Sequence, residues 1–441
     1  MHVQPPTMST LPKDALTVEE RAVLLKAALR LIPFMGLLYF VSFLDRVNVS
    51  YAALTMNADL GLSASAFGMG AGIFFIGYFL FEVPSNLILH RVGARTWIAR
   101  ILVTWGLVSM GMAMVFGPRT FLLARFLLGV AEAGFFPGMI LYLTYWFPGR
   151  ERGRIVGAFM LAVPISSAIG GPLSTALLET PLFGLTGWQT LFVVEGLPAV
   201  LLGGVVLAWL PDRPAQAPWL SERERECLER VVAREESAPT HLRDGLLSGS
   251  VWLFSAIYFG LVLGLYGFGF WAPQIIKGLG HLTNQQVGLI SAIPYVVAGV
   301  AMLLWGRHSD RTGERVWHVC ASACLGALGF LASATVSDPW LSLMALTCGA
   351  AGIYAALPVF WTLPTVALSG TAAASGIALI NSVGNLGGYL GPYVVGLLKD
   401  WSGGYAAGML FLAGALLISG LLALASPDGR RVLAPGLRKA G

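Results

Sequence analysis

Apolar residues along this chain fall into twelve long runs separated by short polar stretches. A helix that crosses the hydrocarbon core of a bilayer needs about 20 predominantly apolar residues, and each run reaches that length. The pattern therefore predicts an all-α membrane protein with twelve transmembrane helices. They cover approximately residues 30–53, 64–89, 97–116, 120–147, 155–178, 188–211, 250–276, 285–306, 316–336, 339–363, 372–398 and 403–425.

The polar stretches contain a repeat that divides the chain into two halves. Arg91-Val-Gly-Ala-Arg95 recurs as Arg311-Thr-Gly-Glu-Arg315, displaced by 220 residues, and each copy lies between the second and third spans of its half. A repeat on this scale is typical of duplicated transporters, so we expect two pseudo-symmetric six-helix bundles. The expected domains are an N-terminal tail (1–29), an N-terminal bundle (30–211), a linker (212–249), a C-terminal bundle (250–425) and a C-terminal tail (426–441).

Composition supports a membrane protein and excludes the soluble globular class. Of the 441 residues 56% are hydrophobic and 12% are charged, whereas about 25% charged residues is usual in soluble domains. With the N-terminus in the cytoplasm, 23 of the 28 Lys and Arg residues lie in tails and cytoplasmic loops. The positive-inside rule then places both termini in the cytoplasm. The net charge of +5 thus reflects topology, and we expect a monomer in the lipid bilayer that binds no nucleic acid.

Four charged residues lie inside spans where lipid disfavours them. Asp45 and Arg46 are the only Asp, Glu, Lys, Arg or His residues between Leu31 and Leu54, and Arg125 and Glu132 are the only ones between residues 121 and 147. A charge near the bilayer centre costs roughly 2.5 to 3.5 kcal/mol, so four unpaired charges would cost about 10 to 14 kcal/mol. These side chains must therefore pair or line a polar cavity.

Helical spacing limits how the four can meet. Arg125 and Glu132 are seven residues apart, so they share one helix face about 10 Å apart along the axis. Asp45 and Arg46 are adjacent and diverge by roughly 100°, so one can point at a central cavity while the other reaches sideways. One interpretation is that two ion pairs lock two helices together, although buried pairs stabilise poorly. The other is that an arginine captures a substrate carboxylate while an acid carries a proton.

The C-terminal half offers neutral polar groups instead of charges. No Asp, Glu, Lys, Arg or His occurs from Trp340 to Leu398, so charge handling is expected in the N-terminal half. The candidate groups for the opposite wall are Tyr266, Trp271, Gln274, Tyr295, Tyr354, Trp361, Asn381 and Asn385. The two asparagines are preferred, because a buried amide needs hydrogen-bond partners, and Trp361 is assigned with them to the opposite wall.

Three other acids lie near helices. We expect Glu82 and Glu195 to pair between bundles or with loops rather than to carry protons, and Glu179 to lie at the outer edge. The six histidines form no pair at metal-ligand spacing on a helix, so no metal, cofactor or catalytic site is expected and the chain is not interpreted as an enzyme. A transporter-like sensor is an alternative without a visible output domain.

Several motifs resemble those of a known family. Gly306-Arg-His-Ser-Asp310-Arg311-Thr-Gly313-Glu-Arg315 resembles the loop signature of the major facilitator superfamily, with His90 in the place of the acid in the first copy. Phe43-Leu-Asp-Arg-Val-Asn-Val-Ser-Tyr51, the stretch from Gly77 to Asn86, and the stretch from Arg125 to Pro137 are similar to its anion:cation symporter family. The stretches Leu141-Tyr-Leu-Thr-Tyr-Trp-Phe-Pro148 and Pro211-Asp-Arg-Pro214 are most similar to the bacterial tartrate-transporter branch. The resemblance implies the fold of the major facilitator superfamily and a location in the bacterial inner membrane.

The resemblance also implies roles for individual residues. Asp45, Glu132 and Arg125 would serve proton coupling, and Arg46 and Tyr78 substrate binding. Residues of the two loop copies would act as gates; they are Arg91, Gly93, Arg95, Asp310, Arg311, Gly313 and Arg315. We therefore expect proton-coupled uptake of a small organic carboxylate, tartrate or a related hydroxy-dicarboxylate. Phe43 stands where the family often has Tyr, which leaves a sugar acid or an aromatic acid of the phthalate or hydroxyphenylacetate type as alternatives.

Overall fold

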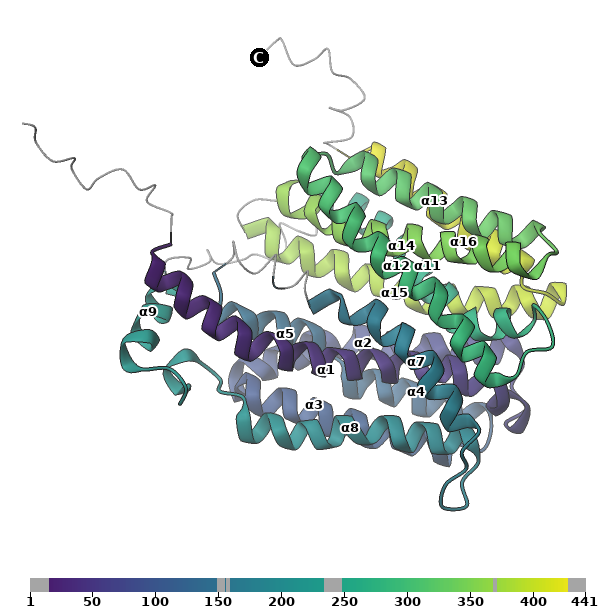
Figure 1. Ribbon diagram of the computed structural model, residues 1–441, viewed down its shortest axis with the longest axis horizontal. Coiled ribbons are helices and arrows are strands. Elements are labelled where there is room, and N and C mark those ends of the chain that lie inside the picture. Colours follow the sequence, from purple (N-terminus) through teal and green to yellow (C-terminus); the bar gives the residue numbers. More distant parts are fainter. Residues whose placement is uncertain (1–15, 149–154, 156–158, 234–247, 368–370, 427–441) are drawn as a thin grey trace, which may run out of the picture.

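The computed structural model describes residues 16–148, 155, 159–233, 248–367 and 371–426. Long helices lie side by side along the longest axis of the molecule (Figure 1). They are α1 (Val18–Asp59), α2 (Ala64–Val92), α3 (Ala94–Gly111), α4 (Pro118–Glu132), α5 (Phe135–Thr144), α7 (Ala162–Leu178), α8 (Gly187–Trp209), α9 (Glu222–Ala233), α11 (Gly249–Lys277), α12 (Asn284–Thr312), α13 (Val316–Thr335), α14 (Pro339–Ala367), α15 (Thr371–Ser402) and α16 (Ala406–Leu424).

Most of these helices have the length and composition of membrane spans. Within the described ranges ten segments qualify, with α4 and α5 counted as one. The expected spans outside this set are α7, which has 17 residues, and α15, which carries two asparagines and several glycines. Each expected span thus overlaps at least one of these helices, and the chain is an all-helical, multi-pass membrane protein.

The helices form two groups in sequence order. Helices α1 to α8 occupy the lower part of Figure 1 and α11 to α16 the upper part. The groups meet mainly where α2 packs on α15, α7 on α12 and α1 on α11. We name the end with α9 and the α2–α3 and α12–α13 turns the linker end, and the end with the α1–α2 and α11–α12 turns the distal end. The site described below lies between the two groups.

Helix α1 begins twelve residues earlier than the expected span, at Val18. Thr17 and Glu20 form a capping box that satisfies the free backbone N–H groups of the first turn. Lys26 then reaches α9 and contacts Glu224 at 2.8 Å. The first turns of α1 therefore belong to a surface helix that the linker helix covers, and the apolar span continues from it without a break.

The expected fourth span, 120–147, corresponds to one candidate membrane segment, Pro118–Thr144, but its helix is interrupted. Helix α4 ends at Glu132 and α5 begins at Phe135. Gly134 has φ +83°, and a Cβ atom there would lie 2.3 Å from the Ser85 hydroxyl, so only glycine fits. Pro137 follows in the first turn of α5, where its missing N–H is tolerated. The break leaves Glu132 at a helix terminus in the interior of the protein.

The two groups are in close contact at the distal end. Asp400 of α15 accepts hydrogen bonds from the backbone N–H groups of Ala64 (3.0 Å) and Ser65 (2.8 Å) at the start of α2. Backbones of the two helices touch because glycines face them. A Cβ atom on Gly68 would lie 2.3 Å from the carbonyl oxygen of Pro392. The distal end is therefore closed in this conformation.

Candidate functional site

Arg46 and Glu132 form a buried ion pair between α1 and the end of α4. The Nη2 atom of Arg46 donates to Oε1 of Glu132, and the two side chains are 9% and 1% exposed. The hydroxyl of Ser42 donates to the same oxygen at 2.9 Å. The C-terminal end of a helix disfavours negative charge, so Glu132 depends on Arg46 for compensation. The two residues that the sequence placed on different spans do meet.

Arg46 also connects the two halves of the molecule. Its Nη1 atom donates to the hydroxyl of Tyr266 on α11 at 3.1 Å. Its guanidinium lies 5.4 Å from the ring centre of Phe43 and 5.3 Å from that of Phe74, distances at which aromatic rings attract a cation. The ring of Tyr78 is 5.8 Å away. The arginine is thus held in an aromatic cage with one N–H group directed at each half.

Three polar atoms of this cluster have no hydrogen-bond partner in the protein. They are Nε of Arg46, Oε2 of Glu132 and Nη1 of Arg125. A buried donor or acceptor without a partner costs about 1 to 3 kcal/mol. Two guanidinium N–H groups therefore remain available to a ligand that brings acceptor oxygens, and a carboxylate is the ligand that arginine binds best.

Asp45 points away from Arg46, as the expected divergence of adjacent residues requires. Its carboxylate accepts from Nε1 of Trp105 at 2.5 Å and from the hydroxyl of Ser109, both on α3. Asn48 donates from its amide nitrogen at 3.0 Å. The side chain is 1% exposed. Asp45 is therefore satisfied inside the N-terminal half, beside the central cavity rather than in it.

Arg125 is fully buried and is not paired with an acid in this conformation. It donates through Nε to the carbonyl of Gly70 and through Nη2 to that of Ala71, both at 3.3 Å. Its guanidinium lies 5.2 Å from the ring centre of Phe74, which is the ring it shares with Arg46. Among the described acids none forms a salt bridge with it.

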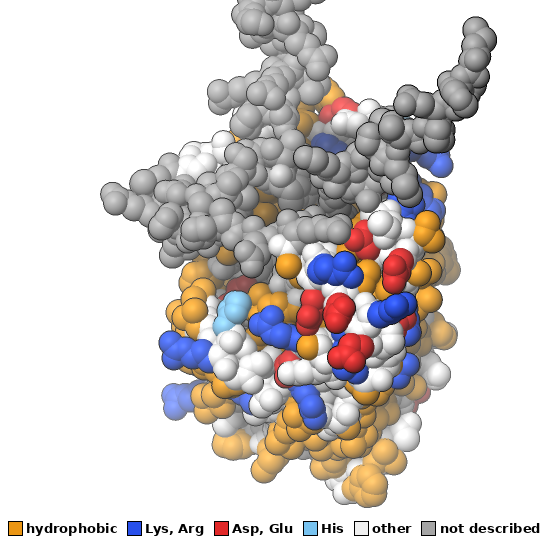
Figure 2. Space-filling model, turned by 90° about the vertical axis from the view of Figure 1, so that its left-hand side faces the viewer, with side chains coloured by type: hydrophobic (Ala, Val, Ile, Leu, Met, Phe, Trp, Pro, Cys, Tyr) orange, Lys and Arg blue, Asp and Glu red, His pale blue; other side chains and the backbone are white. Residues whose placement is uncertain are grey.

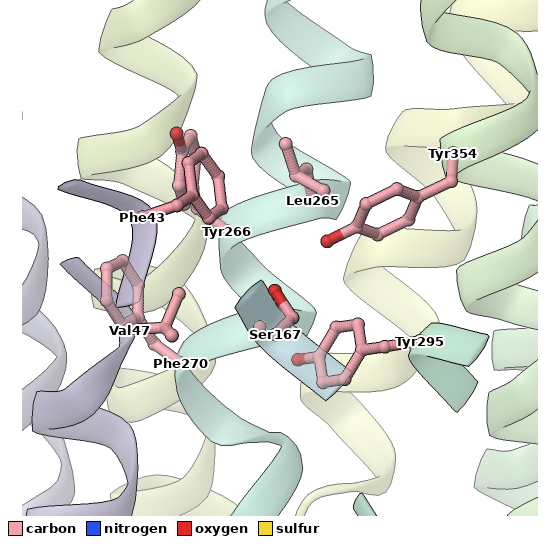
Figure 3. Close-up of a pocket in the computed structure, with 9 residues that line it drawn as sticks. Phe43, Val47, Ser167, Leu265, Tyr266, Phe270, Tyr295 and Tyr354 are labelled. Atoms are coloured by element: carbon pink, nitrogen blue, oxygen red, sulfur yellow. The ribbon is translucent and has the colours of Figure 1, made fainter. Parts of the chain in front are cut away.

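A small cavity lies between the two halves, next to Arg46. Its lining is mostly aromatic and comes from α1, α7, α11, α12 and α14; the residues are Phe43, Val47, Ser167, Leu265, Tyr266, Gly269, Phe270, Tyr295 and Tyr354. Figure 3 shows the hydroxyls of Tyr354, Tyr295 and Ser167 directed into the shared space. The volume is about 10 Å³, room for about one water molecule. An organic anion can enter only after the halves separate.

The three preferred residues of the opposite wall lie toward the linker end of this cavity. Trp361 packs edge-on against Tyr258, with ring centres 4.8 Å apart. Asn381 donates to Glu82 of α2 at 3.1 Å, and Asn385, one turn further along α15, is half-buried. Glu82 thus pairs across the two halves, as we expected. The hydroxyl that bonds Arg46 comes instead from Tyr266 of α11, and the hydroxyls of Tyr295 on α12 and Tyr354 on α14 point into the cavity.

The two loop copies are built differently. In the second copy Arg315 forms a salt bridge with Asp310 at 2.7 Å, and Gly313 ends α12 with φ +68°. In the first copy Asp212 accepts from the backbone N–H of Arg95 at 2.7 Å. Its carboxylate also lies against Gly93, which has φ +91°. Asp212, at the end of the sixth expected span, thus contacts the loop in which His90 stands at the position that matches Asp310. Arg91 and Arg311 lie in the last turns of α2 and α12.

Some polar contacts could not be found by motif or spacing. Ser42 donates a hydrogen bond to Glu132, and Tyr266 accepts one from Arg46. Of these two residues, only Tyr266 was among the candidates chosen from the sequence. Two histidines on different helices, His308 and His318, come within 2.8 Å of each other at the linker end. No group of three or more His, Cys, Asp or Glu residues in the described part of the chain could hold a metal ion.

Comparisons with known proteins agree with this architecture. A protein of Agrobacterium vitis named "Putative tartrate transporter" is 53% identical over 410 residues, which are 92% of this chain and 94% of the relative. The inner membrane transport protein RhmT of Escherichia coli is 42% identical over 91% of this chain and 94% of its own length. The fold superposes with a TM-score of 0.73 on a bacterial homolog of the human lysosomal transporter Spinster in an inward-facing and occupied conformation. That match has 16% identity and covers 94% of this chain and 98% of the other.

The match to a family is equally broad. Residues 35–392 and 281–439 match the sequence profile described as Major Facilitator Superfamily. Relatives of high identity over nearly the whole length and the twelve-span helical fold agree with it. The chain belongs to the Major Facilitator Superfamily and is a secondary transporter, not an enzyme.

Proposed function

We propose that this protein couples the uptake of a small organic anion to protons, with tartrate or a related hydroxy-dicarboxylate as the first candidate. The observation that carries the proposal is the set of unpartnered atoms around Arg46, Arg125 and Glu132. Two buried arginines hold free N–H groups, while an acid occupies the arginine nearest the cavity. The names of the relatives at 53% identity favour tartrate among such anions.

The balance of charge supports proton coupling. Arg46 and Arg125 offset Asp45 and Glu132, so the buried cluster of four has no net charge when all are ionised. A substrate carboxylate entering this region adds negative charge in a setting that disfavours it. Protonation of one acid restores the balance. Substrate and proton are then expected to bind together.

The ion pair supplies a mechanism for that coupling. While Glu132 is ionised it holds Arg46, and a substrate carboxylate must compete for the same guanidinium. Protonation of Glu132 weakens this bond and releases Arg46 as the carboxylate anchor. Arg125 then acts as the switch partner that receives either the substrate or an acid, and Asp45 is the second proton-titrating acid. Tyr78, Trp361, Asn381 and Asn385 would contact substrate in the opened cavity.

Transport would proceed by rocking of the two halves around this site. The distal contacts of α2 with α15 would open in one state and the linker-end loops in the other. Those loops contain the proposed gate residues Arg91, Gly93, Arg95, Asp310, Arg311, Gly313 and Arg315. The 10 Å³ cavity fits a state in which the site is closed around its own side chains.

We place the protein in the inner membrane of a bacterial cell, with its linker end facing the cytoplasm. Figure 2 shows this end of the molecule with Lys and Arg side chains spread across it among Asp and Glu. Basic residues gather on the cytoplasmic side of membrane proteins. The relative named as an inner membrane transport protein supports the same location.

Uptake into liposomes tests the proposal. The purified protein would be offered tartrate, an aldonate, phthalate and hydroxyphenylacetate, each with and without an inward proton gradient. Glu132→Gln is expected to retain counterflow and to lose gradient-driven accumulation, while Glu179→Gln, at an exposed position, should match the wild type. Unchanged accumulation in Glu132→Gln would remove Glu132 from the coupling mechanism, and accumulation without any proton gradient would remove proton coupling.

An aromatic acid is the second candidate, favoured by the lining of the cavity. Five rings line the cavity; they belong to Phe43, Tyr266, Phe270, Tyr295 and Tyr354. Such rings bind an aromatic substrate by stacking, whereas tartrate would use mainly their hydroxyls. Preference for phthalate or hydroxyphenylacetate in the uptake panel would decide for this candidate.

A further inference from the structure

The carboxyl group of Glu132 uses only one of its two oxygens in this conformation. Its Oε1 atom accepts from Nη2 of Arg46 and, at 2.9 Å, from the hydroxyl of Ser42. Its Oε2 atom has no hydrogen-bond partner. Oε2 is therefore the oxygen that can take a proton without displacing a donor. The carboxyl thus has one anchored oxygen and one oxygen that is open to a proton.

Ser42 holds the anchored oxygen from α1. Its side chain is 0% exposed, and it lies four residues before Arg46, so the two share one face of the helix. A serine within a helix commonly donates to a carbonyl of the preceding turn, as Ser50 does to Val47 at 2.6 Å. The hydroxyl of Ser42 instead reaches an acid on another helix.

The two donors to Glu132 differ in what they do when substrate arrives. In the proposed mechanism a substrate carboxylate takes Arg46 from the acid, and the same guanidinium already bonds Tyr266 of the other half. Among the described residues, Glu132 is the hydrogen-bond acceptor of the Ser42 hydroxyl. Once Arg46 has moved to the substrate, Ser42 is the donor that keeps Oε1 in place.

We infer that Ser42 is a positioning residue of the proton site, which holds the Glu132 carboxyl in both protonation states and sets the pH at which substrate can displace it from Arg46. The inference rests on the proposed function, in which Glu132 takes up the coupled proton. A hydroxyl bonds an ionised carboxylate more strongly than a neutral acid. Ser42 therefore favours the ionised state, in which Arg46 is held by Glu132 and substrate is excluded.

Other titratable groups act on the same carboxyl. They are Tyr39, Asp45 and Arg46 of α1, Tyr78 of α2 and Arg125 of α4. Glu82, also on α2, is bonded to α15 instead. Helix α3 packs on α4 as well, and its Arg95 and Arg100 lie in its first two turns, at the linker end. Ser42→Ala removes one hydroxyl and leaves all these charges present. Its difference from the wild type therefore reports the single hydrogen bond.

The pH profile of substrate binding tests this role. In liposomes with equal pH on both sides, the half-saturation concentration would be measured for counterflow of tartrate, or of phthalate if the uptake panel selects an aromatic acid. In the wild type this concentration is expected to be constant in acid and to rise about tenfold per pH unit once Glu132 is ionised, because one proton must bind.

Ser42→Ala loses the bond that favours the ionised state, so this rise should begin about one pH unit higher. At alkaline pH the variant should therefore bind the anion about tenfold more tightly than the wild type. A variant that only disturbed packing would bind it more weakly. Alanine is smaller than serine and favours a helix, so Ser42→Ala should fold.

Two variants serve as controls. Ser50→Ala removes a hydroxyl from the same helix that is equally buried, at 1% exposure, but bonded to its own backbone. This variant should keep the wild-type profile. In Glu132→Gln the side chain at this position is neutral at every pH, so adding Ser42→Ala to it should not move the profile.

The outcomes separate the inference from the proposed function. An unshifted profile in Ser42→Ala, or weaker binding at every pH, would overturn the role of Ser42 while the pH-dependent wild type still supports proton coupling. An equal shift in the Glu132→Gln background would assign the effect to a different acid and also overturn the inference. Binding by the wild type that does not depend on pH would overturn the proposed function, and the role of Ser42 with it.

Discussion

The contact of Asp400 with the start of α2 should hold the distal end closed. Its carboxylate accepts from the N–H groups of Ala64 at 3.0 Å and Ser65 at 2.8 Å, and it joins the two halves of the molecule. Asp400→Asn removes the charge and leaves one acceptor oxygen. The closed state then loses a helix-terminus interaction of about 0.3 to 1 kcal/mol and one hydrogen bond of about 0.5 to 1.5 kcal/mol.

The sum, about 0.8 to 2.5 kcal/mol, corresponds to a fourfold to seventyfold shift in population, since about 1.4 kcal/mol is a factor of ten. Spin labels at Thr180 and Ser337, exposed positions in distal-end turns of the two halves, report this opening. The four native cysteines would be replaced first, and the distance distribution measured by electron double resonance. Asp400→Asn should increase the long-distance population.

Asp338→Asn is the matched control. Asp338 also accepts from a helix N-terminus, the N–H group of Leu341 at 2.9 Å, but within one half. Its loss should leave the distance distribution unchanged. An equal shift in both variants would show a general effect of helix capping, and no shift in Asp400→Asn would show that this contact does not stabilise the closed state.

Three further outcomes are expected. A Cβ atom on Gly68 would lie 2.3 Å from a backbone carbonyl of α15, so Gly68→Val should prevent distal closure and abolish transport in liposomes while membrane insertion, measured by blotting, persists. Trp105→Phe removes a 2.5 Å hydrogen bond to Asp45 and should lower stability by about 1.5 to 3 kcal/mol, and an unchanged unfolding midpoint in detergent would contradict this. The Lys26 ammonium lowers the pKa of the Glu224 carboxyl. The contact between α1 and α9 should therefore persist at neutral pH and be lost as pH falls through that lowered pKa. Hydrogen exchange of the α9 backbone would detect the loss.

The sequence was sufficient for those parts of the fold that depend on local chemistry. Long apolar runs must form helices in lipid, because no water is present there to bond the backbone. The expense of intramembrane charge singled out Asp45, Arg46, Arg125 and Glu132 without any knowledge of the fold. Helical spacing also predicted that the side chains of Asp45 and Arg46 would point in different directions.

Spacing was less informative about helix ends and breaks. Helix α1 starts at Val18 because a capping box at Thr17 and contact with α9 extend it beyond the apolar run. The break after Glu132 depends on Ser85 of α2, whose hydroxyl leaves room only for glycine at position 134. Both features arise from packing between segments distant in sequence, which a hydrophobic pattern does not contain.

What the sequence alone determined is therefore a twelve-span transporter with its buried charges in the N-terminal half. Which partner each charge has was decided by tertiary structure. Glu132 bonds Arg46 rather than Arg125, and the hydroxyl that completes the site comes from Tyr266 in the other half. Hydrogen bonds act over about 3 Å, so partner choice depends on side-chain positions that only the packed halves define.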